Sequence, residues 1–201
     1  MKTYSIAPCT PGAPDWNTVD PLHVDQFLWL PPVEIRMTTQ ICYDTEALYV
    51  RQRAVEKQIR AEHRSPFSMV CEDSCMEFFF QPTEDDHRFF NVEWNPNGCA
   101  FIGIGTDGRD TVRLSPLQEQ EWFQPQVHRT EDGWEIIYRI PNDFVRLFFP
   151  AYQPEPGKVL RANCFKCGDL TVQPHYIAWN PVQSLTPNFH RSQDFGMMRF
   201  L

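Results

Sequence analysis

Two glutamates on neighbouring predicted strands are the residues best placed to do chemistry. Glu77 lies in CMEFFFQ and Glu93 in RFFNVEWN, and the acidic segment PTEDDH between them indicates a hairpin turn. Because side chains alternate along a strand, Glu77 shares a face with Phe79, and Asn91 and Glu93 share the corresponding face of the next strand. Aromatic rings among carboxyl and amide groups suit a sugar, which has apolar C–H faces and a hydroxyl rim. Either glutamate, taken alone, is as readily explained by exposure to water.

The same pair of carboxyl groups also fits a hydrolytic function. Two carboxylates at a defined separation cleave glycosidic bonds, but nothing in the sequence fixes their separation or raises one pKa. The segment GIGTDG has no Ser between its glycines and is not followed by a helix. A nucleophile elbow and a dinucleotide site are therefore excluded. A glycan-active hydrolase using Glu77 and Glu93 is kept as an alternative.

Cysteines and acidic turns are the candidate metal ligands, and the metal is left unassigned. The chain has seven Cys, of which Cys71, Cys75, Cys164 and Cys167 can be combined into a four-thiolate zinc site. Cys164 and Cys167 would point to opposite faces of one strand, so we interpret these residues as buried thiols in a reducing compartment. The runs EDS and TEDD carry oxygen ligands suited to calcium, and solvated turns are the simpler interpretation.

Trp179 is the aromatic residue most suited to the rim of a binding site. It ends the segment HYIAW, where a predicted strand meets the long loop NPVQSLTPNFHR. Loops at the ends of sandwiches carry function more often than strand centres do. Trp94 is the second candidate, although its alternation with Phe90 favours the core. Lys166 and His175 lie on nearby segments and are expected to supply polar contacts.

The elements that must position these residues are mostly strands. Three hairpins are predicted, from TTQICYD and LYVRQRAV, from CMEFFFQ and RFFNVEWN, and from FQPQVHRT and WEIIYRIP. PNDFVRLFF is the one predicted short helix. Further strands are predicted in CAFIGIG, KVLRANCFKC, HYIAW and GMMRF. This pattern predicts an all-β fold, an antiparallel two-sheet β-sandwich.

Composition agrees with a single domain. The chain has 201 residues, of which 42% are hydrophobic and 14% aromatic, enough to fill one core. Its 18 Pro indicate stiff, irregular connections. Residues 1–35 are predicted to be an irregular Pro-rich segment that wraps the sandwich, pinned by Trp16 and Trp29. Residues 36–201 are predicted to form the sandwich itself.

The charge and the apolar pattern of the chain exclude several classes of partner. The formal net charge is −8, and no Lys/Arg-rich block occurs, so neither nucleic acid nor an anionic membrane surface is an expected partner. No apolar run approaches the length of a membrane span. The start MKTYSIAPCTPGAPDW lacks the apolar region of a signal peptide. We expect a cytoplasmic protein as encoded, and an extracellular one only if a leader has been removed.

Six segments, in this order, resemble the carbohydrate-binding module family 9-like domains, which are related to the DOMON-type sandwiches: YDTEALYVRQRAVEKQIRA, DSCMEFFFQP, RFFNVEWNPNG, GWEIIYRIP, RANCFKCGD and YIAWNPVQSLTPNFHRSQDFG. The resemblance implies a two-sheet sandwich that binds a mono-, di- or oligosaccharide without cleaving it. It also implies two tryptophans that clamp a terminal sugar unit, and calcium ions that support the loops. By position Trp179 takes the first clamp role, and Trp94 is the nearest candidate for the second.

Three functions follow from these observations. Non-catalytic saccharide binding beside Trp179 is the preferred interpretation. The hydrolase that uses Glu77 and Glu93 is the second. A protein-interaction sandwich without a small ligand is the third, and it predicts a flat apolar patch in place of a cleft. No cofactor is required by the residues themselves, and structural calcium is the candidate that the resemblance adds.

Overall fold

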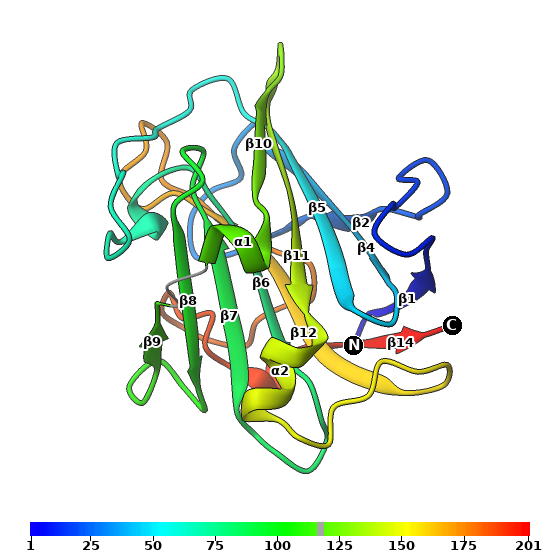
Figure 1. Ribbon diagram of the computed structural model, residues 1–201. Helices are drawn as coiled ribbons and strands as arrows, with labels where there is room; N and C mark the ends of the chain where they lie inside the picture. Colours follow the sequence, from blue (N-terminus) through cyan, green and yellow to red (C-terminus); the bar gives the residue numbers. More distant parts are fainter. Residues whose placement is uncertain (116–118) are drawn as a thin grey trace.

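The computed structural model describes residues 1–115 and 119–201, and it consists mainly of strands (Figure 1). Two sheets pack face to face. The first sheet contains β2 (Leu22–Val24), β4 (Arg36–Tyr43), β5 (Ala47–Val55), β10 (Gln126–Arg129) and β11 (Gly133–Pro141). The second contains β3 (Gln26–Phe27), β6 (Cys75–Gln81), β7 (Phe89–Trp94), β8 (Ala100–Gly105), β9 (Val112–Leu114), β12 (Val159–Cys167), β13 (Tyr176–Ala178) and β14 (Gly196–Phe200).

Strand β1 (Thr3–Pro8) joins the two sheets along one edge. Its first residues pair in parallel with β14, and its last two pair in parallel with β4. The other pairings between the described strands are antiparallel. By pairing on both sides, β1 covers two strand edges that would otherwise present unpaired backbone groups.

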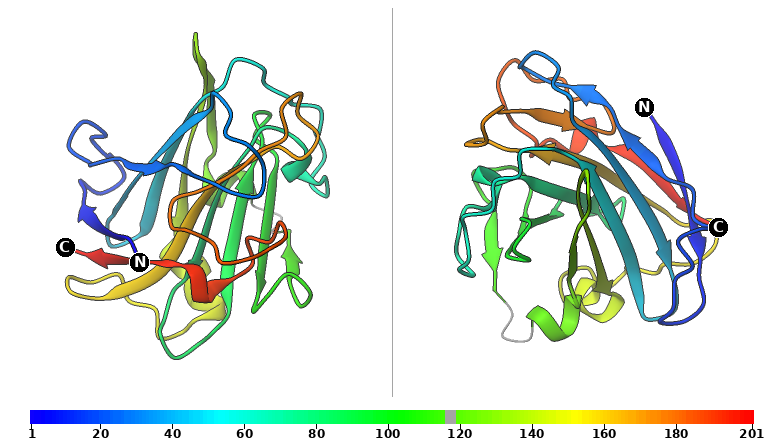
Figure 2. Two further views of the ribbon diagram at one scale, coloured as in Figure 1. Left: turned by 180° about the vertical axis from the view of Figure 1, so that it is seen from behind. Right: turned by 90° about the horizontal axis from the view of Figure 1, so that it is seen from above.

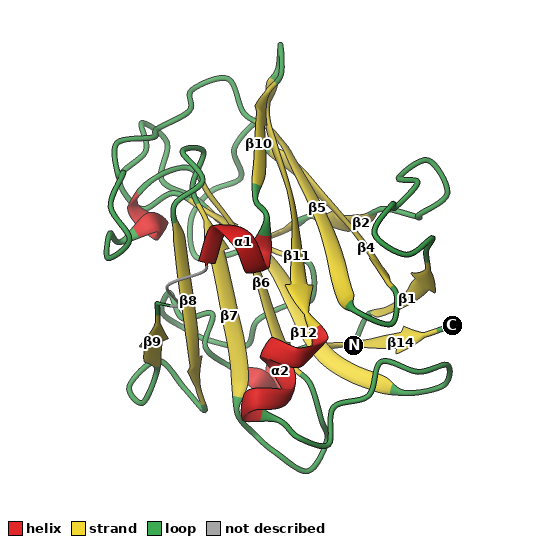
Figure 3. Cartoon of the chain, viewed as in Figure 1, coloured by secondary structure: helices red, strands yellow, loops and turns green. Residues whose placement is uncertain are grey.

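The predicted sandwich is confirmed, and so are its three hairpins, β4–β5, β6–β7 and β10–β11. The predicted helix is α2 (Asn142–Phe148). The structure adds a second short helix, α1 (Glu119–Phe123), and two 3-10 turns, η1 (Val70–Glu72) and η2 (Ser192–Asp194) (Figure 3). No helix in the described ranges combines the length and the apolar character that crossing a membrane requires.

Two details differ from the expectation. The sheet is mixed, because β1 is parallel to both of its neighbours. The segment 1–35 is not wholly irregular, since it contains β1, β2 and β3. The last two have only three and two residues, too few to show the alternation from which strands are recognised in a sequence.

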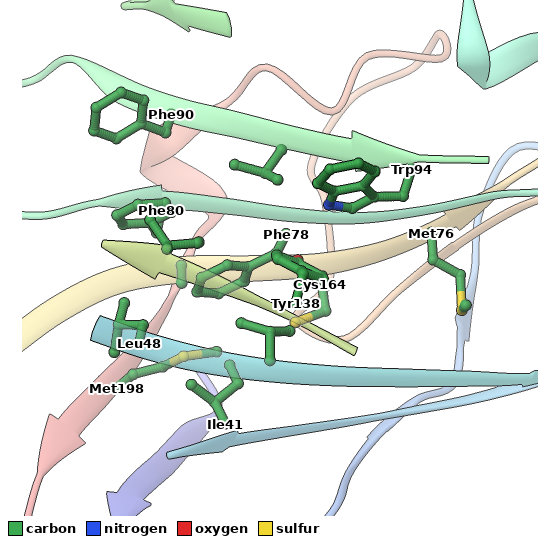
Figure 4. Close-up of a cluster of buried hydrophobic side chains, with 14 of the residues drawn as sticks. Ile41, Leu48, Met76, Phe78, Phe80, Phe90, Trp94, Tyr138, Cys164 and Met198 are labelled. Atoms are coloured by element: carbon green, nitrogen blue, oxygen red, sulfur yellow. The ribbon is translucent and has the colours of Figure 1, made fainter. Parts of the chain in front are cut away.

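The main core lies between the sheets and is filled by alternate residues of each strand (Figure 4). In β6, Met76, Phe78 and Phe80 point inward and are fully buried. Trp94 and Tyr138 meet them from β7 and β11, with ring centroids 5.4 Å apart. Each such side chain contributes about 1.5–3 kcal/mol through burial, so this face determines how the sheets stack.

The outer face of the second sheet carries a separate aromatic cluster and is covered by loops. Phe79, Phe89, Phe165, Phe189 and Phe195 form its centre. The loop after β13, in orange to red, crosses this face in the left view of Figure 2. Strand residues of one parity therefore build the core, while those of the other parity lie beneath loops.

Candidate functional site

A cavity of about 380 Å³ lies between the outer face of the second sheet and its covering loops. Its size falls within the usual range for small-molecule sites. Its lining is aromatic, acidic and thiol-bearing: Trp29, Met69, Cys71, Glu77, Phe79, Glu93, Phe101, Gly108, Thr111, Cys167, Asp169, Tyr176, Pro187, Asn188, Phe189 and His190. A larger hollow of about 860 Å³ along β2 and β4 is lined mainly by aliphatic and charged side chains. The rings among its lining residues are those of His23 and Phe27, fewer than in the smaller cavity.

Glu77 and Glu93 form the floor of the cavity. They occupy directly opposite positions of the antiparallel pair β6–β7, and both are almost fully buried. Burial raises the pKa of Glu93 to about 7, although Asn91 and Arg113 oppose this rise. Burial, and then the neighbouring Glu93, raise the pKa of Glu77 well above its ordinary value. At neutral pH the floor therefore retains protons that two exposed glutamates would have lost.

Asn91 holds Glu93 in place from two residues earlier on β7. Its Nδ2 donates a hydrogen bond of 2.7 Å to Oε1 of Glu93. The room for this amide comes from Gly103 on β8, where a Cβ would overlap the side chain of Asn91. The orientation of Glu93 thus depends on a glycine in the adjacent strand.

Trp29, Tyr176 and Phe189 form one wall of the cavity. The ring centroid of Trp29 lies 5.4 Å from that of Tyr176 and 5.6 Å from that of Phe189. Nε1 of Trp29 donates a hydrogen bond of 2.7 Å to the carbonyl of Ser184. Phe189 stacks on Phe165 of the sheet, with centroids 4.0 Å apart. These ring contacts and this hydrogen bond together hold the loop of Trp29 against the loop that carries Phe189, which is distant in sequence.

Phe101 and His190 border the cavity from two further directions. Phe101 lies opposite Glu93 on β8, and the guanidinium of Arg113 sits 4.3 Å from its ring centroid. His190 lies 5.1 Å, centroid to centroid, from Phe79. Burial lowers the pKa of His190, which keeps the imidazole neutral at neutral pH. The groups that surround the floor are thus mostly rings and neutral polar atoms.

Three of the seven predicted site residues are brought together in this cavity. Glu77 and Glu93 line it, and Asn91 lies beside Glu93. The strand register confirms that the three share one face of the sheet. Alternation along the two strands was sufficient to predict this arrangement.

Trp179 and Trp94 are elsewhere, and the structure corrects both clamp assignments. Trp179 is only 3% exposed and belongs to the core between the sheets. Its backbone N–H bonds to the carbonyl of Cys164, and its ring packs so closely on Gly196 that a Cβ there would come within 2.5 Å. The chain enters the loop only after Trp179 has turned inward. Trp94 is fully buried against Tyr138 and Phe123, in agreement with its alternation.

Lys166 and His175 also lie outside the cavity. Lys166 pairs with inward-facing Met76, so its side chain points between the sheets. Its Nζ lies 3.1 Å from Oε2 of Glu56 and 3.0 Å from Nε2 of His175. Burial, followed by Lys166, lowers the pKa of His175 to about 4. The neutral imidazole accepts from Lys166 and donates from Nδ1 to the carbonyl of Gln173, so these groups form a buried polar cluster.

The residues that sequence reasoning missed are mainly aromatic. Trp29 was expected to pin the N-terminal segment, and it does so while also lining the cavity. Its positive φ of 58° belongs to a loop conformation that no periodicity reveals. Phe101 could have been found, because pairing CAFIGIG with the preceding strand places it beside Glu93. Phe189, His190 and Tyr176 depend on how loops fold back, which carries no local signal.

Calcium stays a prediction, and one aspartate in each of the two acidic runs named for it is already engaged by donors from the protein. Asp73 accepts hydrogen bonds from the backbone of Glu62 and His63, and pairs with Arg60 at 2.7 Å. Asp86 pairs with Arg88. Among the residues that the structure describes, neither run takes part in a group of three ligand side chains close enough to share one ion.

The two-sheet sandwich can be compared with known proteins. The model of Carbohydrate-binding family 9 matches residues 12–200, so the chain belongs to that family. The predicted family is confirmed, and with it non-catalytic carbohydrate binding as the class of function. The match begins inside the N-terminal segment predicted to wrap the sandwich, and the boundary at residue 36 stays a prediction.

Solved structures share the fold over nearly the whole chain. A protein from Bacteroides uniformis ATCC 8492, described as a candidate carbohydrate-binding protein, has a TM-score of 0.85 at 24% identity and covers 100% of this chain and 99% of its own. A family 9 module from Caldicellulosiruptor kristjanssonii in complex with glucose has a TM-score of 0.72 at 13% identity, covering 100% and 96%. A complex with cellotriose from the same organism has a TM-score of 0.71 at 14% identity, covering 99% and 93%. Among curated proteins, nothing matches the chain.

Replacing Lys166 by Met should destabilise the protein. The carboxylate of Glu56 would remain buried without its cation, which typically costs about 3–5 kcal/mol. The free energy of unfolding, measured by urea denaturation, gives the loss. The double variant Glu56→Gln/Lys166→Met removes both charges and should recover most of it. Wild-type stability of the single variant would show that this pair is not buried in solution.

Replacing Glu93 by Gln should change how stability depends on pH. The pKa of Glu93 is higher in the folded protein than in the unfolded chain, so its contribution is present at low pH and lost as pH rises through about 7. Between about pH 5 and about pH 8 the wild type should lose on the order of 3 kcal/mol more unfolding free energy than the variant. The exposed glutamate of the β10–β11 turn gives a control variant, Glu131→Gln, which should follow the wild type. Parallel pH curves for the wild type and Glu93→Gln would contradict the assignment.

Proposed function

We propose that this chain binds a neutral saccharide of the glucose type in the cavity above Glu77 and Glu93. The observation that carries the proposal is the combination of an aromatic wall with a floor of two buried, adjacent carboxyl groups whose pKa values are raised by burial. A ring stacked on Trp29 or Phe101 would use the apolar C–H face of the sugar. The carboxyl groups would then meet its hydroxyls. Related modules are described in complex with glucose and with cellotriose, which supports this class of ligand.

Protonated carboxyl groups suit a neutral sugar for an electrostatic reason. A carboxylic acid both donates and accepts hydrogen bonds, whereas a carboxylate only accepts. A sugar hydroxyl also does both, so each acid can pair with a hydroxyl in either direction. A pair of carboxylates would bury two like charges side by side, which is costly in a closed site. Neutral recognition therefore follows from the same burial that raises both pKa values.

The same feature weighs against the hydrolase alternative. A retaining glycosidase needs one carboxylate as nucleophile beside one protonated acid, and environments that push their pKa values apart. Here burial raises the pKa of both Glu77 and Glu93, and no feature around either lowers its pKa below the ordinary range. The pair is suited to hold a sugar. An interaction sandwich is also disfavoured, because the mixture of rings and acids lines a hollow and not a flat patch.

Titration of the reduced protein with glucose and with cellotriose, by calorimetry, tests the proposal. Trp29→Ala removes a wall of the cavity and should weaken binding at least about tenfold, which corresponds to about 1.4 kcal/mol. Trp16→Ala is the matched control, because Trp16 is another half-buried tryptophan of the N-terminal segment that lies outside the cavity. Glu93→Gln keeps the size of the side chain and should weaken binding by a smaller factor.

A sugar site near Trp179 and a hydrolytic activity would each give a distinct experimental result. If Trp179→Phe abolished binding while Trp29→Ala left it intact, the sugar would sit near Trp179 and the proposal would be wrong. Release of product from an aryl glycoside, lost in Glu77→Gln, would favour the hydrolase. Absence of binding to both sugars and to a panel of other monosaccharides would contradict a glucose-type ligand.

A further inference from the structure

Two thiols and a carboxyl group converge in the floor of the cavity. The ligand atoms of Cys75, Glu77 and Cys167 all lie within 4.8 Å of one another. Sγ of Cys167 donates to Oε1 of Glu77 across 2.8 Å. All three side chains are almost fully buried. Within the described ranges, these three residues form the group of His, Cys, Asp or Glu side chains whose ligand atoms lie close enough together to share one ion.

The strand register creates this cluster. Cys75 and Cys167 are directly opposite each other on β6 and β12, so their side chains leave the sheet side by side. Glu77 follows Cys75 by two residues and points to the same face. Cys164, which sequence reasoning had grouped with them, has the opposite parity and lies in the core between the sheets. The cluster is thus a fixed property of two paired strands.

The surroundings of the cluster are short of positive charge. Burial raises the pKa of Cys75 to about 12, and contact with the Cys75 thiol together with burial raises the pKa of Cys167. Glu93, Cys71 and Asp169 lie nearby and each can only add negative charge. Lys166, on the other face of β12 and paired with Glu56, acts on Cys75 and Glu77 through space but only partly offsets the rise in their pKa values. A divalent cation could replace the protons that otherwise keep these groups neutral.

We propose that Cys75, Glu77 and Cys167 bind a thiophilic divalent cation of the zinc type. Thiolate ligands select zinc and its heavier analogues over calcium or magnesium, which prefer oxygen. Binding releases the thiol protons, and that of Glu77 where it is protonated, to solvent. Three ligands leave one tetrahedral position unfilled by this group. Because Glu77 and Cys167 line the cavity, the ion can enter from it, and the fourth position faces water or a ligand there.

The metal cluster rests on other contacts than the proposed sugar site, although the two share Glu77. The cluster is complete without a sugar, so metal affinity can be measured on the sugar-free protein. If sugar binding failed and metal binding succeeded, the cavity would be a metal site of another purpose. If both succeeded, a glucose titration with and without Zn²⁺ would show whether the open position faces the sugar.

The experiment uses the full chain, reduced and freed of metal, and titrates it with Cd²⁺ and Co²⁺ as spectroscopic probes. We expect one equivalent to bind with the charge-transfer absorption that thiolate ligation produces, and Zn²⁺ to displace it. Cys75→Ser and Cys167→Ser should each lose most of that absorption. Cys164→Ala is the matched control on the same strand and should keep it. Cys99→Ser, at a half-buried thiol in the turn before β8, is a second control in case Cys164→Ala does not fold.

Three results would overturn the proposal. The first is the absence of charge-transfer absorption in a wild type that circular dichroism shows to be folded and thiol titration shows to be reduced. The second is absorption that survives in the double variant Cys75→Ser/Cys167→Ser, which would place the metal on other thiols. The third is equal loss of absorption in folded control variants.

Discussion

Two carboxyl groups placed opposite each other on neighbouring strands are costly to cover, because like charges repel and buried charges lose their water. Glu77 and Glu93 are nevertheless buried, beneath the loops that cover the outer face of the second sheet. The cost falls when the pair retains protons, which is what burial enforces. The floor then carries less negative charge than two exposed glutamates would, and it remains strongly polar. Water solvates such a surface well, and a hydroxyl-rich ligand can take the place of that water.

The covering loops are held by aromatic contacts that do not involve the glutamates. Phe189 stacks on Phe165 of the sheet, and Trp29 reaches across to the loop that carries Phe189. These rings bury apolar area and so fix the loops without filling the space above the floor. The cavity therefore stays open. Contacts between the wall residues and the sheet hold its walls. Asn91, in the space that Gly103 leaves, holds Glu93 in its floor.

Much of the fold could be predicted from alternation. The parity of Met76, Phe78 and Phe80 separated the core from the outer face, and the same parity brought Glu77, Asn91 and Glu93 together. It also indicated that Trp94 belongs to the core, which the structure confirms. Trp179 could not be placed this way, since it follows a strand of three residues and its direction is decided by contact with Gly196. Lys166 was expected to supply a polar contact to the site, and the register with Met76 shows that it points inward toward Glu56. The wall residues come from loops, whose packing is a tertiary property that a single sequence does not display.

A crystal structure of the protein grown or soaked with glucose tests the central claim most directly. We expect the sugar ring to lie in the cavity above Glu77 and Glu93, against Trp29 or Phe101, with its hydroxyls within hydrogen-bond distance of at least one of the two carboxyl groups. A sugar bound elsewhere, for instance in the hollow along β2 and β4, would contradict the claim. So would a sugar in the cavity that made no contact with either carboxyl group, because the floor would then have no part in recognition.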